Sequence, residues 1–318
     1  MTMGYRIIGT GAALPERIVS NAEMCGCVDT SEEWIESRTG IRERRFCGPE
    51  EDAFLLAERA ARAALTDAGI SGEEVGCCLA ATMTAPTLVP GVACRVHRAL
   101  GLPEGIPSLD VNGACTGFLL SASAAAGFLT LSGGRYALLV GCEQLSAVTD
   151  MTDRSTCVLF GDGAGALVLE WDPALPEAWA FGTRGSDALH LSAGGKLQME
   201  GREVFRFAVE TVPACAQRVL KRAGLSVDQV DYLVCHQANA RIIAQCAKRL
   251  GIGPDRVYMN LQELGNTSAA SIPLAIHGMA ENGLLKPGSR LLCVGFGGGL
   301  SWCGTLLTWK GAKEHAAE

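Results

Sequence analysis

The strongest candidate for a nucleophile in this sequence is Cys115. A short apolar strand is predicted to end near Asp110, a turn containing Gly113 follows, and Cys115 opens the apolar, alanine-rich run 116–126. A strand-to-helix turn of this kind exposes a side chain at a helix N-terminus, where backbone N–H groups and the helix dipole lower the pKa of a thiol. Since the chain has 14 cysteines and free Cys is often a small core residue, this segment alone leaves both roles open.

Two further polar residues have comparable settings in the second half of the chain. His236 directly follows the predicted strand 232–235, and open α/β sheets bind ligands at the carboxyl ends of their strands. Asn266 precedes an alanine-rich helical run, in the position that matches the turn at Cys115. The other histidines are weaker candidates because they fall in predicted helices, a loop or a polar tail: His97, His277, His190 and His315.

An internal repeat indicates how residues so far apart in sequence can meet. Two segments and one residue recur at a nearly constant offset of 154 or 155 positions: 65–75 at 220–230, 134–141 at 288–295, and Asn112 at Asn266. The constant spacing argues against chance matches of common residues, so each half is predicted to be a copy of one βαβ-containing unit.

The repeat divides the chain into two predicted halves. The boundary lies near 171–177, where two prolines and mixed charge interrupt the pattern. The N-terminal half, 1–172, carries Cys115, and the C-terminal half, 173–318, carries His236 and Asn266. Duplicated halves place their strand ends face to face, so the three side chains are predicted to converge.

Length and composition exclude some classes of protein. A length of 318 residues suggests about two domains, and 48% apolar with 19% charged residues is typical of a globular protein with a large core. The net charge of −7 excludes a nucleic-acid-binding surface over the whole molecule. An anionic ligand must therefore meet a local basic cluster, and the sequence contains one: Arg38, Arg42, Arg44 and Arg45.

The cysteines predict reduced thiols in the cytoplasm. The chain is long, and residues 1–6 run straight into a predicted strand without a signal peptide. No CxxC pair and no Cys/His quartet with zinc spacing occurs, so no metal site is predicted. No apolar run reaches ~18 residues without polar interruption, which argues against a membrane span.

Three other segments carry expectations. A helix over 30–38 presents Trp34 and Arg38 on one face, as a packed surface helix or as a flat aromatic surface beside a cation, suited to a nucleotide. The glycine run 161–165 is predicted to join strands 157–160 and 166–169 as a hairpin, which disfavours a dinucleotide site. Residues 182–202, rich in Gly and Ser, are predicted to form a long functional loop.

Taken together, these motifs resemble the 3-oxoacyl-[acyl-carrier-protein] synthase III family of the thiolase-like superfamily over nearly the whole chain. The matching segments are WI and RTGIRER within 34–44, NGACTGF at 112–118, DRST at 153–156, FGDGAGA at 160–166, HQAN at 236–239, GNTSAAS at 265–271 and FGGG at 296–299. The resemblance implies a thiolase-like α/β fold, in which two duplicated halves form a layered α-β-α-β-α core.

The resemblance also implies a two-step acyl transfer. Cys115 would take the acyl group of a short acyl-CoA, with the backbone N–H groups of Cys115 and Gly298 as the oxyanion hole. Malonyl-ACP (ACP, acyl carrier protein) would then lose CO2, His236 and Asn266 would stabilise the enolate, and the carbanion would attack the acyl-cysteine. No metal or redox cofactor is implied. Asn266 in place of a second His separates the chain from the elongating synthases, which use Cys-His-His.

Binding residues follow from the same resemblance. Trp34 and Arg154 would sandwich the adenine of CoA with Arg38 near its phosphates, and Gly201, Phe205, Asn239 and Phe296 would line the substrate path. The carrier protein would dock on a basic patch, which lets an acidic enzyme bind an acidic partner. This patch would comprise Gln237, Ala238, Asn239, Ala240, Arg241, Lys248 and Arg206. A cytoplasmic homodimer is implied as well.

Several alternatives stay open. The same resemblance implies that the 182–202 loop borders the acyl pocket, and this loop looks shorter than in the best-known members. Leu88-Val89 stands where some members have a Phe that closes the pocket of the dimer mate, so the acyl-chain preference is undetermined. A ketosynthase of secondary metabolism and a hydroxymethylglutaryl-CoA synthase share the superfamily, and a thiolase would need Cys303 as a second catalytic Cys. A papain-like hydrolase also uses Cys, His and Asn, but there the Asn orients the His. A non-catalytic partner subunit would not need all three residues.

Overall fold

The computed structural model describes residues 4–172, 174–175 and 178–311. Residue 173, where the second half is predicted to begin, and His315 lie outside the described residues.

The described strands form a mixed nine-stranded sheet in which two groups meet along one edge. The first group runs in the order β5 (Ser108–Val111), β4 (Val75–Ala81), β6 (Tyr136–Glu143), β7 (Gly163–Asp172) and β1 (Gly4–Ala13). The second contains β11 (Tyr232–Cys235), β12 (Arg290–Gly297), β13 (Gly299–Trp309) and β8 (Trp179–Ser186). A short parallel register from Tyr5 opposite Leu307 to Ile7 opposite Trp309 joins β1 to β13.

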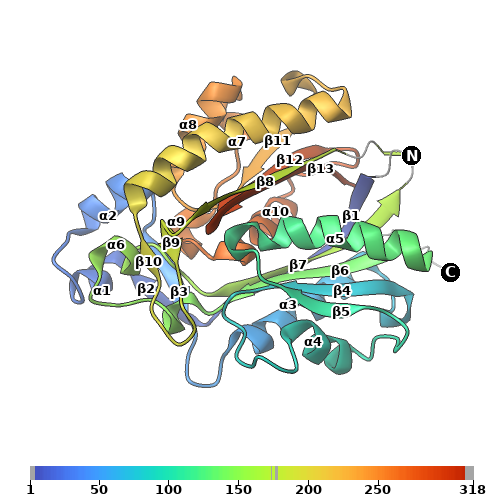
Figure 1. Ribbon diagram of the computed structural model, residues 1–318, viewed down its shortest axis with the longest axis horizontal. Coiled ribbons are helices and arrows are strands. Elements are labelled where there is room, and N and C mark those ends of the chain that lie inside the picture. The colour runs from blue at the N-terminus through green and yellow to red at the C-terminus, as the bar shows by residue number, and fades with distance from the viewer. Residues whose placement is uncertain (1–3, 173, 176–177, 312–318) are drawn as a thin grey trace.

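Helices cover the two strand groups and separate them (Figure 1). The outer face of the first group carries α3 (Ala53–Ala68) and α4 (Val92–Leu100), and that of the second carries α7 (Gly201–Ala223), with α8 (Ala240–Leu250) against it. Between the groups lie α5 (Gly117–Ser132) and α10 (Ser271–Glu281), which contact strands of both. Three large apolar clusters fill the interfaces between these layers. The predicted α-β-α-β-α order is confirmed.

Equivalent elements recur at the offset seen in the sequence. Helices α3 and α7 each end at a glycine in the left-handed conformation, Gly69 and Gly224, where the absence of a Cβ makes that conformation inexpensive. A 3-10 turn with a capping box then leads into the next strand in both cases: η1 (Gly72–Glu74) before β4, and η4 (Val227–Gln229) before β11.

The turns before the two central helices are equivalent as well. The 3-10 turn η2 (Ala114–Thr116) precedes α5, and η6 (Ser268–Ala270) precedes α10. Their first residues are the two non-glycine residues with positive φ in the described chain, Ala114 at 46° and Ser268 at 48°. Both halves therefore use the same left-handed turn to start their central helix.

One helical segment is apolar enough on average to meet the length and hydropathy test for a membrane span, although polar residues interrupt it. The helical segment Ala114–Ser132 is long enough and apolar enough to cross a membrane, with a mean hydropathy of 1.6. Its Ser, Thr and Gly residues, taken above as interruptions, are small and only weakly polar. Half of the segment is buried inside the fold, between β4, β6 and β13, as in the core helix of a soluble protein.

The prediction that the glycine run 161–165 joins two strands as a hairpin is wrong. Residues Arg154–Cys157 form helix α6, and the run 161–165 leads into β7 instead of connecting two strands. A Cβ on Gly165 would lie 2.7 Å from the backbone nitrogen of Leu274. The glycine is therefore needed for the close approach of α10 to β7, a contact between distant segments that local sequence does not reveal.

The region predicted as a long loop has structure of its own. After β8, strands β9 (Leu189–His190) and β10 (Gln198–Met199) pair antiparallel, and α7 begins at Gly201. This β9–β10 hairpin lies beside the functional site described below.

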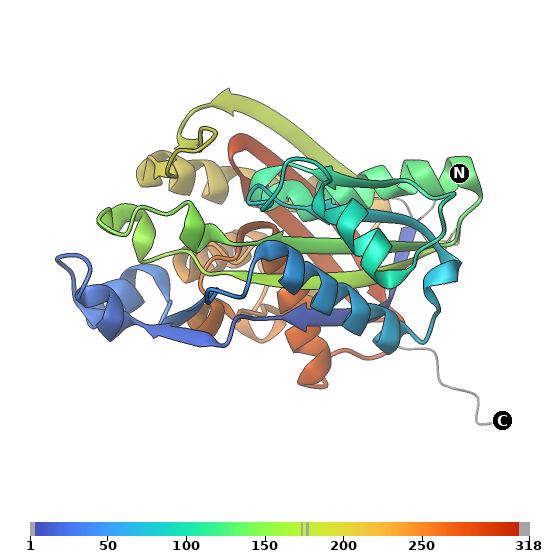
Figure 2. The ribbon, with the colours of Figure 1, turned by 90° about the horizontal axis from the view of Figure 1, so that it is seen from below.

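An excursion of the N-terminal half lies at one end of the molecule in both views (Figures 1 and 2). It contains the antiparallel pair β2 (Arg17–Ser20) and β3 (Glu43–Phe46), with α1 (Asn21–Cys25) and α2 (Glu32–Thr39) between them. Arg44 is fully buried there, and its guanidinium donates to Asn21 Oδ1 (2.9 Å) and Val158 O (2.7 Å). Burial lowers the pKa of Arg44 to about 10. Arg44 is thus a structural residue, and it is not available to an anionic ligand as part of the predicted basic cluster.

The remaining described helical segments are short. They are α9 (Leu261–Leu264), η3 (Leu145–Ala147) and η5 (Pro254–Arg256).

Candidate active site

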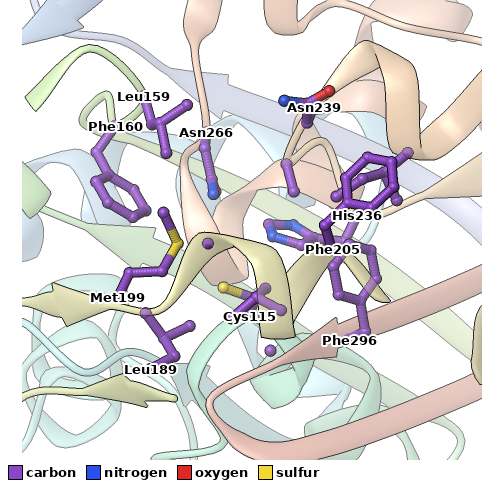
Figure 3. Close-up of a pocket in the computed structure, with 15 residues that line it drawn as sticks. Cys115, Leu159, Phe160, Leu189, Met199, Phe205, His236, Asn239, Asn266 and Phe296 are labelled. Carbon is purple, nitrogen blue, oxygen red and sulfur yellow. The ribbon is translucent and has the colours of Figure 1, made fainter. Parts of the chain in front are cut away.

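A cavity of about 160 Å³ contains all three predicted catalytic residues (Figure 3). Cys115 enters from η2, His236 from the residue after β11, and Asn266 from the turn before η6. The sulfur, one edge of the imidazole and the amide end of Asn266 face the same space in Figure 3. The two halves of the chain therefore share one pocket.

Cys115 is held tightly by the glycine loop between β12 and β13. A Cβ on Gly297 would lie 2.8 Å from the Cβ of Cys115 and 3.0 Å from its backbone nitrogen. Gly297 lines the pocket, and a Cβ on Gly298 would lie 3.5 Å from Ala114 Cβ and Leu189 O. The N–H of Gly298 belongs to the peptide that begins at Gly297, so this peptide lies against the nucleophile.

The predicted lowering of the Cys115 pKa is wrong for this conformation. Cys115 is only 5% exposed, and burial raises its pKa to about 12. The side chain of Ser268 and the backbone N–H of Cys115 lower the pKa, and the charge of Glu143 raises it further. Desolvation of the thiolate outweighs the N-terminal end of the helix. The sulfur is therefore a thiol that must lose its proton as it reacts.

His236 is a neutral imidazole with one nitrogen already engaged. Burial lowers its pKa to about 3, and its ring lies edge-to-face with Phe296 at 5.2 Å between centroids. Nδ1 lies 2.7 Å from Ser271 Oγ, which also accepts from the Gln237 N–H at 3.4 Å. Because Ser271 Oγ already accepts a hydrogen bond, we assign its own hydrogen to Nδ1. This tautomer leaves Nε2–H as a donor for the pocket.

Asn266 is oriented by backbone contacts. Its N–H donates to Leu159 O (2.8 Å), and its C=O accepts from the Gly161 N–H (3.0 Å). Its side-chain Oδ1 accepts from the Ser268 N–H at 2.9 Å, so the NH2 end is directed into the pocket. Asn266 forms no described hydrogen bond with His236, whose Nδ1 partner is Ser271. This differs from the Asn–His pairing of a papain-like hydrolase.

Glu143 is a buried carboxylate near the nucleophile whose role the sequence analysis missed. It ends β6, and its Oε2 accepts from Thr84 Oγ1 (2.6 Å), Thr82 Oγ1 (3.3 Å) and the Met83 N–H (3.2 Å). Burial raises its pKa to about 7. The available signal was one acidic residue directly after an apolar run, at the carboxyl end of a strand.

The inner part of the pocket is apolar. Leu189 and Met199 come from the β9–β10 hairpin, and Leu159 and Phe160 from the segment after α6. Leu189 and Met199 belong to the 182–202 region, which was predicted to border the acyl pocket, whereas Leu159 and Phe160 were not predicted to line the site.

The predicted substrate path lines the same pocket. Gly201, Phe205, Ala238, Asn239 and Phe296 all face it. Asn239 caps α8 by accepting from the Arg241 N–H (2.9 Å), and its Nδ2 donates to Arg38 O (3.0 Å), which ties α8 to α2. Arg241 lies over the ring of Phe205, with 5.7 Å from its Cζ to the ring centroid.

The other predicted binding residues lie outside the pocket lining. Arg154 stacks on Trp34, with 4.8 Å from Cζ to the ring centroid, and both are exposed, as is Arg38. Arg206 and Lys248 are exposed on α7 and α8, and Ala240 is half-buried. Gln237, by contrast, is buried, and its amide bonds Cys235 O (2.8 Å) and the Asn260 N–H (3.2 Å). Its side chain is not available to a docking protein.

Cys303 is buried in the apolar cluster of the central layers and does not line the pocket. A thiolase mechanism that uses it as a second catalytic thiol therefore has no support. Within the described ranges, no group of three or more His, Cys, Asp or Glu side chains is placed to hold a metal ion.

Comparison with known proteins gives a consistent result. Family models for 3-oxoacyl-[acyl-carrier-protein] synthase III match residues 109–183 and, for its C-terminal part, 220–309. Beta-ketoacyl-[acyl-carrier-protein] synthase III of Clostridium acetobutylicum is 42% identical, covering 95% of this chain and 98% of the relative.

Solved structures agree with the sequence relatives. The crystal structure of 3-oxoacyl-[acyl-carrier-protein] synthase III from Aquifex aeolicus has a TM-score of 0.91 at 40% identity, covering 95% of this chain and 99% of that one. The priming beta-ketosynthase of the R1128 polyketide pathway has a TM-score of 0.92 at 36% identity, covering 98% and 97%. The chain therefore belongs to the 3-oxoacyl-[acyl-carrier-protein] synthase III family.

Proposed function

We propose that the chain is a condensing acyltransferase that initiates fatty acid synthesis. It transfers the acyl group of a short acyl-CoA to Cys115 and condenses it with malonyl-ACP, which gives 3-oxoacyl-ACP, CO2 and CoA. The observation that supports this most directly is the pocket shared by one thiol and two N–H donors that do not bond each other.

The first step is acylation of Cys115. The sulfur attacks the thioester carbonyl, and the carbonyl oxygen becomes an oxyanion. The backbone N–H groups of Cys115 and Gly298 are its donors, and the close packing of Gly297 on Cys115 supports their convergence. CoA then leaves as the thiolate.

The second step is decarboxylative condensation. Malonyl-ACP loses CO2, and the enolate that forms needs hydrogen-bond donors at its oxygen. His236 Nε2–H and Asn266 Nδ2–H fill this role, because Ser271 and Ser268 occupy the other polar atoms of these side chains. Each such donor lowers the barrier by about 3 kcal/mol in comparable oxyanion sites. The carbanion attacks the acyl-cysteine.

CoA binds along the path from the surface to Cys115. The adenine lies between Trp34 and Arg154, Arg38 is near the phosphates, and Gly201, Phe205 and Asn239 contact the pantetheine. A flat base between two groups needs about 7 Å between them, two contacts of ~3.5 Å, so Arg154 must move away from its position 4.8 Å from Trp34.

The acidic carrier protein docks on the exposed cations Arg241, Arg206 and Lys248 beside the pocket mouth, with the backbone of 238–240. Gln237 is left out of this surface because it is buried.

The assembly and the location of the protein are part of the same proposal. We place it in the cytoplasm as a homodimer, with halves 1–172 and 173–318 within each chain. Leu88 and Val89 are 95% and 88% exposed at the rim of the first strand group, and a partner subunit would cover them.

The decisive experiment is acyl labelling. Incubation with acetyl-CoA should add one acetyl group, located by mass spectrometry on the peptide that contains Cys115. Cys115→Ala should abolish the label. A label on another peptide would contradict the proposal.

A priming ketosynthase of polyketide synthesis is the second candidate, since the R1128 enzyme is as similar in structure as the fatty-acid enzyme. Product formation from acetyl-CoA with malonyl-ACP, compared with malonyl-CoA and other acceptors, separates the two. Equal rates with malonyl-ACP and malonyl-CoA would contradict both the proposed role in fatty acid synthesis and the proposed docking of the carrier protein on the basic patch.

A further inference from the structure

Glu143 and Ser268 have one buried polar atom each that the described hydrogen bonds do not use. Oε2 of Glu143 accepts from three donors, but its Oε1 has no partner. Ser268 Oγ is likewise buried without a partner. A buried polar atom without a hydrogen bond costs free energy of folding, so two of them at one site suggest a functional role.

Ser268 belongs to η6, which contacts both η2, where Cys115 lies, and β6, which ends at Glu143. Its side chain lowers the pKa of both Cys115 and Glu143. Its backbone is held at φ 48°, a strained conformation for serine, and its N–H orients Asn266. The turn therefore fixes Ser268 next to Cys115 at a cost in backbone energy.

His236 is poorly suited to receive the thiol proton. Its Nδ1 is bonded to Ser271, its Nε2 already carries a hydrogen in the assigned tautomer, and burial disfavours the imidazolium. Glu143 is the one charged side chain whose field acts on Cys115 in the described structure.

We propose that Ser268 and Glu143 form a proton relay for Cys115, a role that rests on the acyl transfer proposed above. The relay takes the thiol proton during acylation, stores it on Glu143 while the acyl-enzyme exists, and returns it when condensation releases the cysteine.

The proton balance closes over one cycle. As the sulfur–carbon bond forms, the thiol proton passes to Ser268 Oγ, and the Ser268 hydroxyl proton passes to Glu143 Oε1. The carbon–sulfur bond to CoA breaks, and the CoA thiolate takes a proton from solvent. In the second step the malonyl carboxylate leaves as CO2, and its electron pair forms the new carbon–carbon bond. The Cys115 thiolate is expelled, and it recovers the proton from Glu143 through Ser268.

The surroundings of Glu143 suit this task. The titratable groups facing it are Cys115 from η2 and Cys142 from its own strand, both thiols whose pKa values its charge raises. Thr82 and Thr84 after β4 are neutral donors to Glu143, and Ser268 from η6 adds no charge beside it. A proton acceptor works best when its pKa is near the working pH, and burial brings that of Glu143 to about 7.

The first test measures proton removal without any acyl-CoA. Alkylation of Cys115 by iodoacetamide, followed on its own peptide between about pH 5 and about pH 9, should level off above about pH 7 in the wild type. In Glu143→Gln and Ser268→Ala the rate should be about a hundredfold lower at pH 7.5 and should rise tenfold per pH unit without levelling. Glu143→Asp should restore the plateau in part.

Ser121→Ala is the matched control, because Ser121 is another buried hydroxyl without a partner, on α5. It should keep the wild-type profile. Identical profiles for wild type and Glu143→Gln would overturn the relay.

The second test observes the stored proton. The infrared difference spectrum between acetylated and free enzyme should contain the band of a protonated carboxylic acid, which Glu143→Gln should lack. If Cys115 acetylates but the band is absent from the wild type, the relay is wrong and the acyl transfer stands. If acetyl-CoA labels another residue, the proposed function fails, and the alkylation profile still decides the relay.

Discussion

At the scale of single residues, the site separates two tasks that one histidine performs in many enzymes. His236 is neutral and offers a hydrogen-bond donor, so it stabilises negative charge on substrate. In the proposed relay, removal of the thiol proton falls to Glu143. His236 then stays neutral through the cycle, and only Glu143 changes its protonation state.

Loss of either donor should stop the second step only. His236→Ala and Asn266→Ala should acylate normally with acetyl-CoA, because neither contacts the acylation oxyanion. Decarboxylation of malonyl-ACP should fall by about a hundredfold or more in each, the usual loss for an oxyanion donor. Release of CO2 from labelled malonyl-ACP is the measurement. Loss of acylation in both variants would place these residues in the first step.

The raised pKa of Glu143 makes stability depend on pH. The folded pKa of about 7 exceeds the unfolded value of 4.5, so the protonated carboxyl stabilises the fold fully below pH 4.5, and this contribution is lost as pH rises to 7. The free energy of unfolding of the wild type, minus that of Glu143→Gln, should therefore fall by about 3 kcal/mol over that window. Urea unfolding at about pH 5 and pH 8 measures it; an unchanged difference would show that Glu143 titrates normally.

At the scale of elements, helices and strands can be predicted from local sequence, whereas the residues that line the pocket from distant segments cannot. The strand 232–235 has the predicted bounds, because a short apolar run is a local signal. The run 161–165 was misassigned because its glycines serve contact with α10, and glycine in a sequence does not distinguish a turn from a close approach. The nucleophile, its two donors and Gly201, Phe205 and Asn239 were predicted to share a site and do line one pocket. The 182–202 region was predicted to border the acyl pocket, but its hairpin structure and the role of Glu143 became visible only in the fold.

The β9–β10 hairpin should set the acyl-chain preference. Met199 fills part of the inner pocket, so Met199→Ala should improve kcat/KM for longer acyl-CoA substrates relative to acetyl-CoA, by about tenfold per methylene accommodated. Gln198→Ala, exposed on the same strand, is the control and should change nothing. An unaltered chain-length profile for Met199→Ala would mean that the acyl group lies elsewhere.

At the scale of the whole molecule, we propose that the two repeated units form the site between them and that a local patch of positive charge binds the carrier protein. The chain carries a net charge of −7, so an acidic carrier protein is attracted only where cations gather, at the mouth formed by α7 and α8.

Reversing one charge of this patch should affect the second substrate alone. Lys248→Glu should raise KM for malonyl-ACP about fivefold, the effect of one exposed ion pair of ~1 kcal/mol, and should leave the acetyl-CoA labelling rate unchanged. Arg218→Glu, exposed further along α7, is the matched control. Equal effects of both variants would indicate general repulsion instead of a docking surface.

The left-handed turns at Ala114 and Ser268 affect how accurately the site is positioned. Each costs about 1–2 kcal/mol that a glycine would save, yet both copies of the unit keep a side chain there. A glycine would also let the turn adopt other backbone conformations, so the Cys115 sulfur or the Asn266 amide beside it would be held less firmly. The two strained turns therefore favour accurate placement of Cys115 and Asn266 over backbone stability, and a variant with glycine at either position should be more stable but position these side chains less accurately.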